Sequence, residues 1–220
     1  MHIDTFIETL STINTPDEMS LNMYKGNSNG AIGRRENLRF YLGVMKEMNP
    51  TRLFIGEAPG RWGCFISGVP FTDEYRLVND KFFNGHYSSI KELIELDQDI
   101  RPQREGTASV VWERLSKISV RQYPLMWNIY PFHPSNIESC YPFADDRENR
   151  KPNRKECELG LHILEMLLDC FNIQQMYAIG RTSEKILKKD FPNIKYICHP
   201  AARSGPNGFR NAFNAVCKIQ

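Results

Sequence analysis

Apolar residues gather in four short runs from residue 52 onward. The runs are RLFIG (52–56), LMWNIY (125–130), MYAIG (176–180) and KYIC (195–198). Most of them are apolar at consecutive positions, which is typical of strands that are covered on both faces of a sheet. The pattern therefore predicts four buried strands.

Segments with helical spacing lie between and after these runs. They cover 111–118, 157–171, 183–191 and 209–216. Asn153, with Glu156 three residues later, predicts a capping box at the start of the second of these helices. Because strands and helices alternate, we expect a three-layer α/β/α sandwich with a central, largely parallel four-stranded sheet.

The first 50 residues are predicted to form an arm of two helices. Apolar residues recur at helical spacing over 3–13 and again over 38–45, and a loop rich in Gly, Asn and Ser is expected at 25–33. We expect this arm (1–50) to pack on the main body. With 220 residues, 41% of them hydrophobic, the whole chain (1–220) fits a single domain with a sizeable core.

The overall charge identifies no partner. The chain has 28 Lys and Arg against 26 Asp and Glu, so its formal net charge is +2 and no strong field surrounds it. One basic segment, RENRKPNRKE (147–156), is either a contact for nucleic-acid phosphates or a solvated loop and helix start.

The sequence favours a protein of a reducing compartment, with no membrane contact. It has no run of about 18 apolar residues, and its N-terminal segment lacks the basic and apolar regions of a secretory signal. None of the six cysteines forms a Cys-x-x-Cys pair. Cys170, Cys198 and Cys217 stand in apolar runs, so we expect buried thiols, a cytoplasmic location, no disulfide and no metal site.

Polar residues directly follow the predicted strands. They are Glu57 to Gly60, Pro131 to Pro134 with His133 among them, Arg181 to Ser183, and His199 with Pro200. The carboxyl ends of parallel strands share one edge of a sheet, and open α/β sheets bind their ligands there. We therefore expect a carboxylate, two histidines and an arginine to meet in one cleft.

Each of these side chains has both a structural and a functional interpretation. The carboxylate of Glu57 directly follows a buried strand. It must therefore be solvated by water, accept a hydrogen bond from a protein donor, or take part in catalysis. His199 is either a satisfied loop residue or a donor to a negatively charged leaving group. Asn128 interrupts an apolar run, and either fixes the sheet by a hydrogen bond or reads a ligand with an adjacent donor and acceptor. Phe71 is either a core residue or a stacking platform.

The order of four motifs carries a more specific signal. GEAPG (56–60) follows a strand, GVPF (68–71) comes soon after, Asn128 lies near the end of the second run, and HPAARSGPNGFR (199–210) follows the last strand. This order and spacing resemble the uracil-DNA glycosylase superfamily, most closely its bacterial and archaeal branch with the GEAPG motif. The resemblance extends from about residue 34 to the C-terminus.

The resemblance implies an enzyme that removes uracil from DNA by hydrolysing the N-glycosidic bond, in base excision repair. It implies that Glu57 and His199 are catalytic, that uracil stacks on Phe71, and that Asn128 reads the edge of the base. The further base-binding candidates are Gly56, Ala58, Pro59 and Gly60. The candidates for DNA contact are Arg61, His133, Arg181, Pro200, Ala201 and Arg203. The expected partner is DNA containing uracil or a related lesion, bound by a monomer.

Departures from the family pattern leave alternatives open. The branch often holds an iron–sulfur cluster, but the Cys-x-x-Cys pair is absent, Pro131-Phe132 replaces a Lys-Cys, and Gly160 stands near the expected fourth ligand. We therefore expect no cofactor. An acidic pair after Gly60 is also missing, and Ala201 replaces a serine. The alternatives are a glycosylase for hypoxanthine, xanthine or mismatched thymine, and a catalytically silent nucleic-acid-binding protein.

Overall fold

A four-stranded parallel sheet forms the centre of the computed structural model, which describes residues 1–83, 104–135, 149–202 and 205–218. Its strands run in the order β3–β2–β5–β6. They are β2 (Arg52–Gly56), β3 (Leu125–Asn128), β5 (Gln175–Ile179) and β6 (Lys195–Ile197). All neighbouring strands are parallel. The four predicted strands are thus confirmed, with small shifts at their ends.

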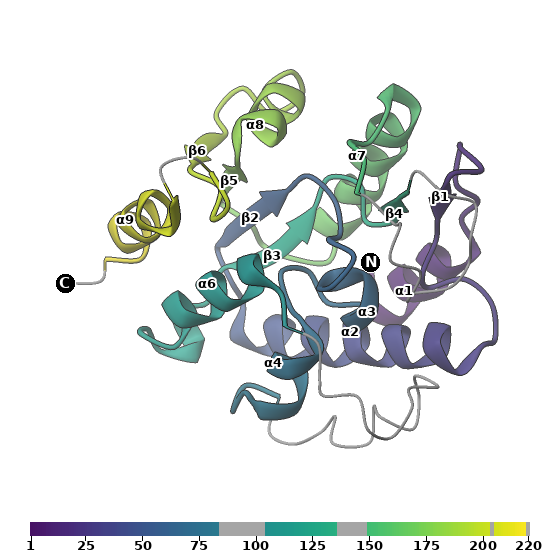
Figure 1. Ribbon diagram of the computed structural model, residues 1–220, viewed down its shortest axis with the longest axis horizontal. Coiled ribbons are helices and arrows are strands. Elements are labelled where there is room, and N and C mark those ends of the chain that lie inside the picture. The colour runs from purple at the N-terminus through teal and green to yellow at the C-terminus, as the bar shows by residue number, and fades with distance from the viewer. Residues whose placement is uncertain (84–103, 136–148, 203–204, 219–220) are drawn as a thin grey trace.

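Helices cover both faces of the sheet (Figure 1). On one face, Phe54 of β2 contacts Phe213 of α9 (Gly205–Cys217), with ring centroids 5.7 Å apart. On the other face, Trp127 of β3 contacts Phe6 of α1 (Ile3–Thr12) at 5.6 Å. The remaining elements are α2 (Asn29–Met48), α3 (Cys64–Ser67), α4 (Glu74–Asn79), α6 (Gly106–Leu115), η1 (Val120–Gln122), α7 (Arg154–Leu168) and α8 (Arg181–Leu187). The protein is therefore a three-layer α/β/α sandwich, as predicted.

The N-terminal arm contains the two predicted helices, but the second begins earlier than predicted. Helix α2 begins at Asn29, inside the expected loop 25–33, because the Ser28 side chain accepts a hydrogen bond from the Ala31 N–H at 3.2 Å and caps the helix. A short strand, β1 (Ser20–Leu21), pairs antiparallel with β4 (His133–Pro134), which the sequence did not indicate. Within the described ranges, no helix is long and apolar enough to span a bilayer.

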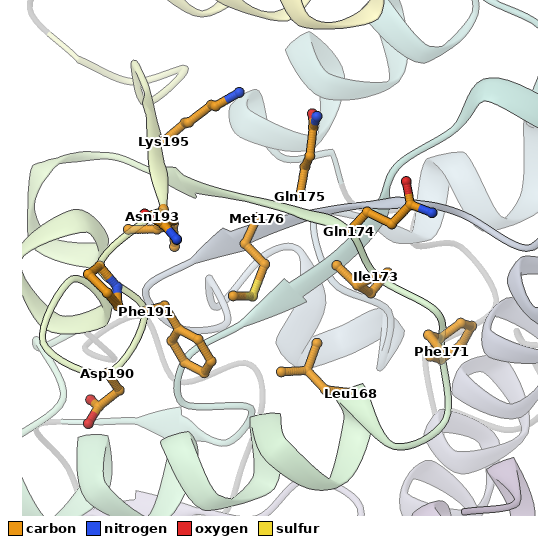
Figure 2. Close-up of a pocket in the computed structure, with 12 residues that line it drawn as sticks. Leu168, Phe171, Ile173, Gln174, Gln175, Met176, Asp190, Phe191, Asn193 and Lys195 are labelled. Carbon is orange, nitrogen blue, oxygen red and sulfur yellow. The ribbon is translucent and has the colours of Figure 1, made fainter.

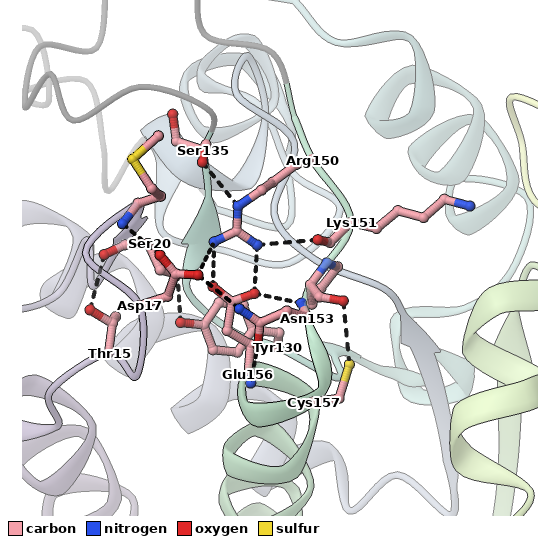
Figure 3. A network of polar contacts seen from close by, with 12 residues as sticks. Thr15, Asp17, Ser20, Tyr130, Ser135, Arg150, Lys151, Asn153, Glu156 and Cys157 are labelled. Carbon is pink, nitrogen blue, oxygen red and sulfur yellow. Dashed lines mark hydrogen bonds and ion pairs between the residues drawn. The ribbon is translucent and has the colours of Figure 1, made fainter.

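A cluster of polar contacts, the Arg150 clamp, joins this arm to the main body (Figure 3). The Arg150 guanidinium donates two hydrogen bonds of 2.6 Å to the carboxylate of the fully buried Glu156, and a third of 3.0 Å to the Ser135 carbonyl. Asn153 and Glu156 form the predicted capping box. Asp17 of the arm lies 3.5 Å from Arg150 and accepts a hydrogen bond of 2.8 Å from Asn153. The clamp thus fixes the segment before α7 against the arm.

Helix α7 approaches the end of β3 so closely that only glycine fits at one contact. An added Cβ at Gly160 would collide with the Ile129 carbonyl oxygen and lie 3.1 Å from the Tyr130 Cα. These neighbours are backbone atoms, which cannot rotate away. The absence of a side chain at position 160 therefore sets the distance between α7 and the sheet.

Replacing Glu156 by Gln should lower the free energy of unfolding by about 3 kcal/mol, because it removes the buried carboxylate that Arg150 contacts at 2.6 Å and leaves Arg150 only the longer 3.5 Å contact with Asp17. The matched control is Arg154→Ala, which removes the exposed Arg154–Glu158 pair. That change should cost no more than about 0.5 kcal/mol. Urea denaturation of both variants measures the difference, and equal effects would contradict the role given to the clamp.

Replacing Gly160 by Ala should cost about 1–3 kcal/mol, since the new methyl group has no room against the Ile129 backbone. Gly43 of α2 provides the opposite case, because nothing lies within 4 Å of an added Cβ there. Gly43→Ala should stabilise the protein by about 0.5–1 kcal/mol. Thermal unfolding should therefore shift in opposite directions for the two variants, and a shift in the same direction would refute the packing argument.

Candidate active site

The carboxyl ends of β2, β3 and β6 open into a pocket of about 390 Å³. The eight residues predicted to be catalytic or to bind the base all line it: Gly56, Glu57, Ala58, Pro59, Gly60, Phe71, Asn128 and His199. Segments that are more than 140 residues apart in the sequence thus meet in one cavity, because the three strands are parallel.

The floor of the pocket is built on Gly56, the last residue of β2. An added Cβ there would collide with the Phe71 ring and lie 2.9 Å from the Asn128 Oδ1. The ring and the amide therefore meet over a backbone with no side chain. This close approach brings an aromatic surface and a hydrogen-bonding edge into the same space.

Phe71 has a backbone conformation that is rare for an aromatic residue, with φ at 55°. The indole N–H of Trp112 donates a hydrogen bond of 3.2 Å to the Phe71 carbonyl. The Ser67 hydroxyl donates to the Thr72 carbonyl at 2.6 Å, and the Ser67 carbonyl accepts from the Asn37 side chain of α2 at 2.7 Å. These buried hydrogen bonds hold the loop, and with it the orientation of the Phe71 ring.

The Asn128 side chain is 3% exposed, and its two ends have different neighbours. Its Nδ2 donates to the Cys64 Sγ at 3.8 Å, while its Oδ1 lies over Gly56. The amide therefore presents its oxygen on the Gly56 side of the pocket and its nitrogen on the Cys64 side. A ligand that pairs with both atoms needs a donor next to an acceptor, in that order.

Glu57 is half-buried at the mouth of β2. Burial raises the pKa of its carboxyl group, while the charge of Lys151 and a hydrogen bond from the Thr182 side chain act in the opposite direction. Its Oε1 is buried and has no hydrogen-bond partner among the described residues. An unpartnered carboxylate oxygen in a pocket can accept a hydrogen bond from a water molecule.

The surroundings of His199 determine both the charge of its imidazole ring and which ring nitrogen carries the proton. Burial lowers the pKa of its imidazole, which favours the neutral ring. Its Nδ1 accepts a hydrogen bond of 3.1 Å from the Ala201 N–H, so the proton of the neutral ring is on Nε2. Ala201, predicted to contact DNA, lines the pocket and uses its backbone to select this tautomer.

Several residues that line the pocket were not predicted from the sequence. One of them is Glu105. Glu105 caps α6: its Oε2 accepts from the Ala108 N–H at 2.8 Å, and its own N–H donates to the Asp73 carboxylate at 2.8 Å. Burial raises the pKa of Glu105. A glutamate just before the helical pattern was the available signal, but glutamate is not a preferred N-cap residue. Cys64, Thr107, Asn149, Arg150 and Lys151 also line the pocket.

Two residues that were predicted to contact DNA lie in the interior of the protein. His133 is fully buried, with its Nδ1 at 3.1 Å from the Pro59 carbonyl oxygen and its ring 4.5 Å from that of Phe65. Pairing of β4 with β1 covers it, so it supports the GEAPG turn from behind. Pro200 is buried as well.

Arg61 and Arg181, which were also predicted to contact DNA, are not among the residues that line the pocket. The Arg61 N–H donates to Asn149, and its guanidinium lies over the Trp62 ring. Arg181 is exposed and pairs with Glu184 at 2.7 Å. Arg203 lies outside the described residues. In the basic run 147–156, Arg150 is held in its clamp, whereas Lys151 points away from it (Figure 3).

The described part of the chain holds no group of three or more His, Cys, Asp or Glu placed to bind a metal ion. Gly160, near the expected fourth ligand, has no space for a cysteine side chain. None of the cysteines of the described ranges forms a disulfide; Cys170 and Cys217 are buried as predicted, but Cys198 is only partly buried. Cys140 lies outside the described residues.

A second cavity, of about 530 Å³, lies at the amino ends of β5 and β6 (Figure 2). Leu168, Met176 and Phe191 point into it, and Asp190 and Lys195 are its charged residues. It contains none of the predicted site residues. The chemistry-bearing side chains are instead gathered at the opposite end of the strands.

Comparison with known proteins gives a structural neighbour but no close relative. No protein-family model matches the chain, and no curated protein does. Among the solved structures, wild-type SMUG2 from Pedobacter heparinus is similar, with a TM-score of 0.68 and 14% sequence identity. The similarity covers 98% of this chain and 96% of that one. At this level of identity the likeness concerns the fold: the chain shares its three-layer architecture with SMUG2 over nearly its whole length.

Proposed function

We propose that this protein is a monofunctional DNA glycosylase that removes uracil by hydrolysing its N-glycosidic bond. The observation that carries the proposal is the meeting of Glu57, Phe71, Asn128 and His199 in one pocket at the carboxyl end of the sheet. Similarity to SMUG2, a member of the uracil-DNA glycosylase superfamily, supports the same class of enzyme. The motif order that resembles this superfamily supports it independently.

Recognition of the base follows from the orientation of Asn128. A base inside a duplex has to be flipped out before a pocket can hold it. The flipped ring stacks on Phe71, which is worth about 1–3 kcal/mol per base. Uracil then donates its N3–H to Oδ1 and accepts at O4 from Nδ2. Cytosine offers the opposite pattern, which leaves both ends of the amide unpaired.

Cleavage develops positive charge on the deoxyribose and negative charge on the departing uracil, as in glycoside hydrolysis. An ionised Glu57 stabilises the sugar cation, and its free Oε1 orients the water and takes its proton. The water oxygen bonds to C1′ as the bond from C1′ to N1 breaks. The electron pair moves into the uracil ring, and the Nε2–H of neutral His199 donates to O2 and stabilises that charge.

Uracil excision should fall sharply when either proposed catalytic residue is changed. Glu57→Gln removes the charge, and His199→Ala removes one donor, whose loss typically costs about 10²–10³ in rate. Single-turnover assays on an end-labelled oligonucleotide with one uracil, followed by alkaline cleavage of abasic sites, measure the rate. Glu165→Gln, which changes an exposed carboxylate on α7, is the control.

The assay also separates the alternatives. Unchanged rates in both variants would contradict the roles of Glu57 and His199. Tight binding of uracil-containing DNA by the folded wild-type protein, with no excision of any base, would favour the silent binding protein instead.

The pH dependence of uracil excision should report the protonation of Glu57. The rate should be lost as the pH falls through the pKa of Glu57, which burial raises above the usual value of about 4.3. Lys151→Ala removes a charge that lowers this pKa, so the acid limb should move to higher pH. Lys155→Ala, outside the pocket, should leave it in place. An acid limb that is the same in all three proteins would exclude this influence of Lys151.

A further inference from the structure

The thiol of Cys64 is the hydrogen-bond partner of the Asn128 side chain in the described part of the chain. The Asn128 Nδ2 donates to the Cys64 Sγ at 3.8 Å. A rotation of 180° about the last side-chain bond would exchange the amide oxygen and nitrogen with almost no change of shape. Whether Cys64 donates or accepts therefore decides which end of Asn128 faces which side of the pocket.

The hydroxyl of Tyr24 limits what the Cys64 thiol can do. The Tyr24 O–H donates a hydrogen bond of 2.8 Å to the Gly68 carbonyl. The same hydroxyl forms a side-chain hydrogen bond with Cys64. Because the single proton of the hydroxyl is used on a carbonyl, which cannot donate, the Tyr24 oxygen accepts in the second bond and the Cys64 S–H donates.

The Cys64 sulfur is left as an acceptor toward Asn128. Burial and the carboxylate of Glu105 raise the pKa of the thiol, so Cys64 keeps the proton that it donates to Tyr24. Its sulfur lone pairs accept the Nδ2–H of Asn128. A reversed amide would place Oδ1 against the sulfur with no hydrogen between two acceptors, and both residues are buried, so the lost hydrogen bond is not replaced by water.

The N-terminal arm holds the helix that carries this thiol. Cys64 is the first residue of α3, and the carbonyls of residues 66, 67 and 68 at the end of this helix accept hydrogen bonds from side chains of the arm. The donors are Arg34 at 3.2 Å, Asn37 at 2.7 Å and Tyr24 at 2.8 Å. Tyr24 is buried and is not among the residues that line the pocket. An effect of its hydroxyl on a ligand must therefore pass through its neighbours.

We propose that Cys64 and Tyr24 are positioning residues that set the orientation of the Asn128 amide and thereby the preference of the pocket for uracil over cytosine. This inference rests on the proposed function, in which Asn128 reads the edge of the base. Both residues act through Asn128 and not on the reacting atoms.

The two bases require opposite orientations of the amide. Uracil donates at N3 and accepts at O4, which matches Oδ1 on the Gly56 side and Nδ2 on the Cys64 side. Cytosine accepts at N3 and donates at N4, so it needs the reversed amide. Reversal breaks the hydrogen bond between Asn128 and Cys64, and this loss is added to the cost of binding cytosine.

Affinity for a base that is not excised measures this preference directly. The probes are two duplexes with 2′-fluoro-2′-deoxyuridine or 2′-fluoro-2′-deoxycytidine at the same position opposite guanine. The electron-withdrawing fluorine disfavours the sugar cation and so protects the glycosidic bond. Fluorescence anisotropy gives both dissociation constants, and the base ratio is that of the cytosine probe divided by that of the uracil probe. Changes in stacking affect both probes alike and cancel in this ratio.

Cys64→Ala removes the sulfur, which makes the two orientations of the amide nearly equal in energy. The base ratio should fall about 2–12-fold, as expected for one net hydrogen bond. Single-turnover uracil excision should fall only about twofold, because about half of the molecules keep the orientation that binds uracil. A purely structural defect would instead lower excision and leave the base ratio unchanged.

Two further variants test the direction of the hydrogen bonds. Tyr24→Phe frees the Cys64 S–H to donate to a reversed Oδ1, so it should lower the base ratio over the same range. Cys64→Ser keeps one donor and one acceptor at the same place and should restore the wild-type ratio.

Two controls remove the same chemical groups elsewhere. Tyr130→Phe removes another buried hydroxyl contact between the arm and the main body, which joins Tyr130 to Ser20 at 2.6 Å. Cys170→Ala removes another buried thiol. Both should have the wild-type base ratio, and thermal unfolding verifies that each variant is folded.

Each outcome gives a decision. A lower base ratio in Cys64→Ala and in Tyr24→Phe, restored in Cys64→Ser, supports the inference. A lower ratio in Cys64→Ala alone overturns the role of Tyr24. An unchanged ratio in a folded Cys64→Ala protein that excises uracil overturns the inference and leaves the proposed function standing. A wild-type protein that neither excises uracil nor prefers the uracil probe would overturn both.

Discussion

The pocket depends on one steric constraint, the absence of a side chain at Gly56. Because this residue ends β2 without a Cβ, the Phe71 ring and the Asn128 amide can meet above the strand. The ring reaches this point through a backbone conformation that costs energy and is held by Trp112 and Ser67. The aromatic ring and the amide are therefore positioned by the same close contact.

The N-terminal arm takes part in building this pocket. Asn37 of α2 holds the loop that carries Phe71, and Asp17 contributes to the clamp that positions the segment with Lys151. Helix α1 also buries Phe6 against the sheet. The arm is thus structural support for residues that lie far from it in the sequence, which gives a physical reason for its presence.

Consecutive apolar positions and helical spacing were enough to predict the sheet, the layers and the edge where the candidate residues meet. Asn128 stood out because a polar residue inside an apolar run needs an explanation. Burial of individual side chains was harder to predict. His133 looked like a rim residue, since the two-residue strand pair that covers it leaves no periodic pattern. The position of Glu105 depends on a contact with the distant Asp73, which no local pattern encodes. The tautomer of His199 depends on the geometry of the turn that brings the Ala201 N–H to its ring.

The ion pairs between arginines and glutamates affect how the binding of a polyanionic ligand would depend on salt. Arg150, Arg154, Arg181 and Arg210 each form an ion pair with a glutamate. A cation that is already neutralised displaces few condensed counterions when a nucleic acid binds, and counterion release sets how steeply affinity falls with salt. For a DNA ligand, these four arginines would therefore add little to the dependence of the association on ionic strength.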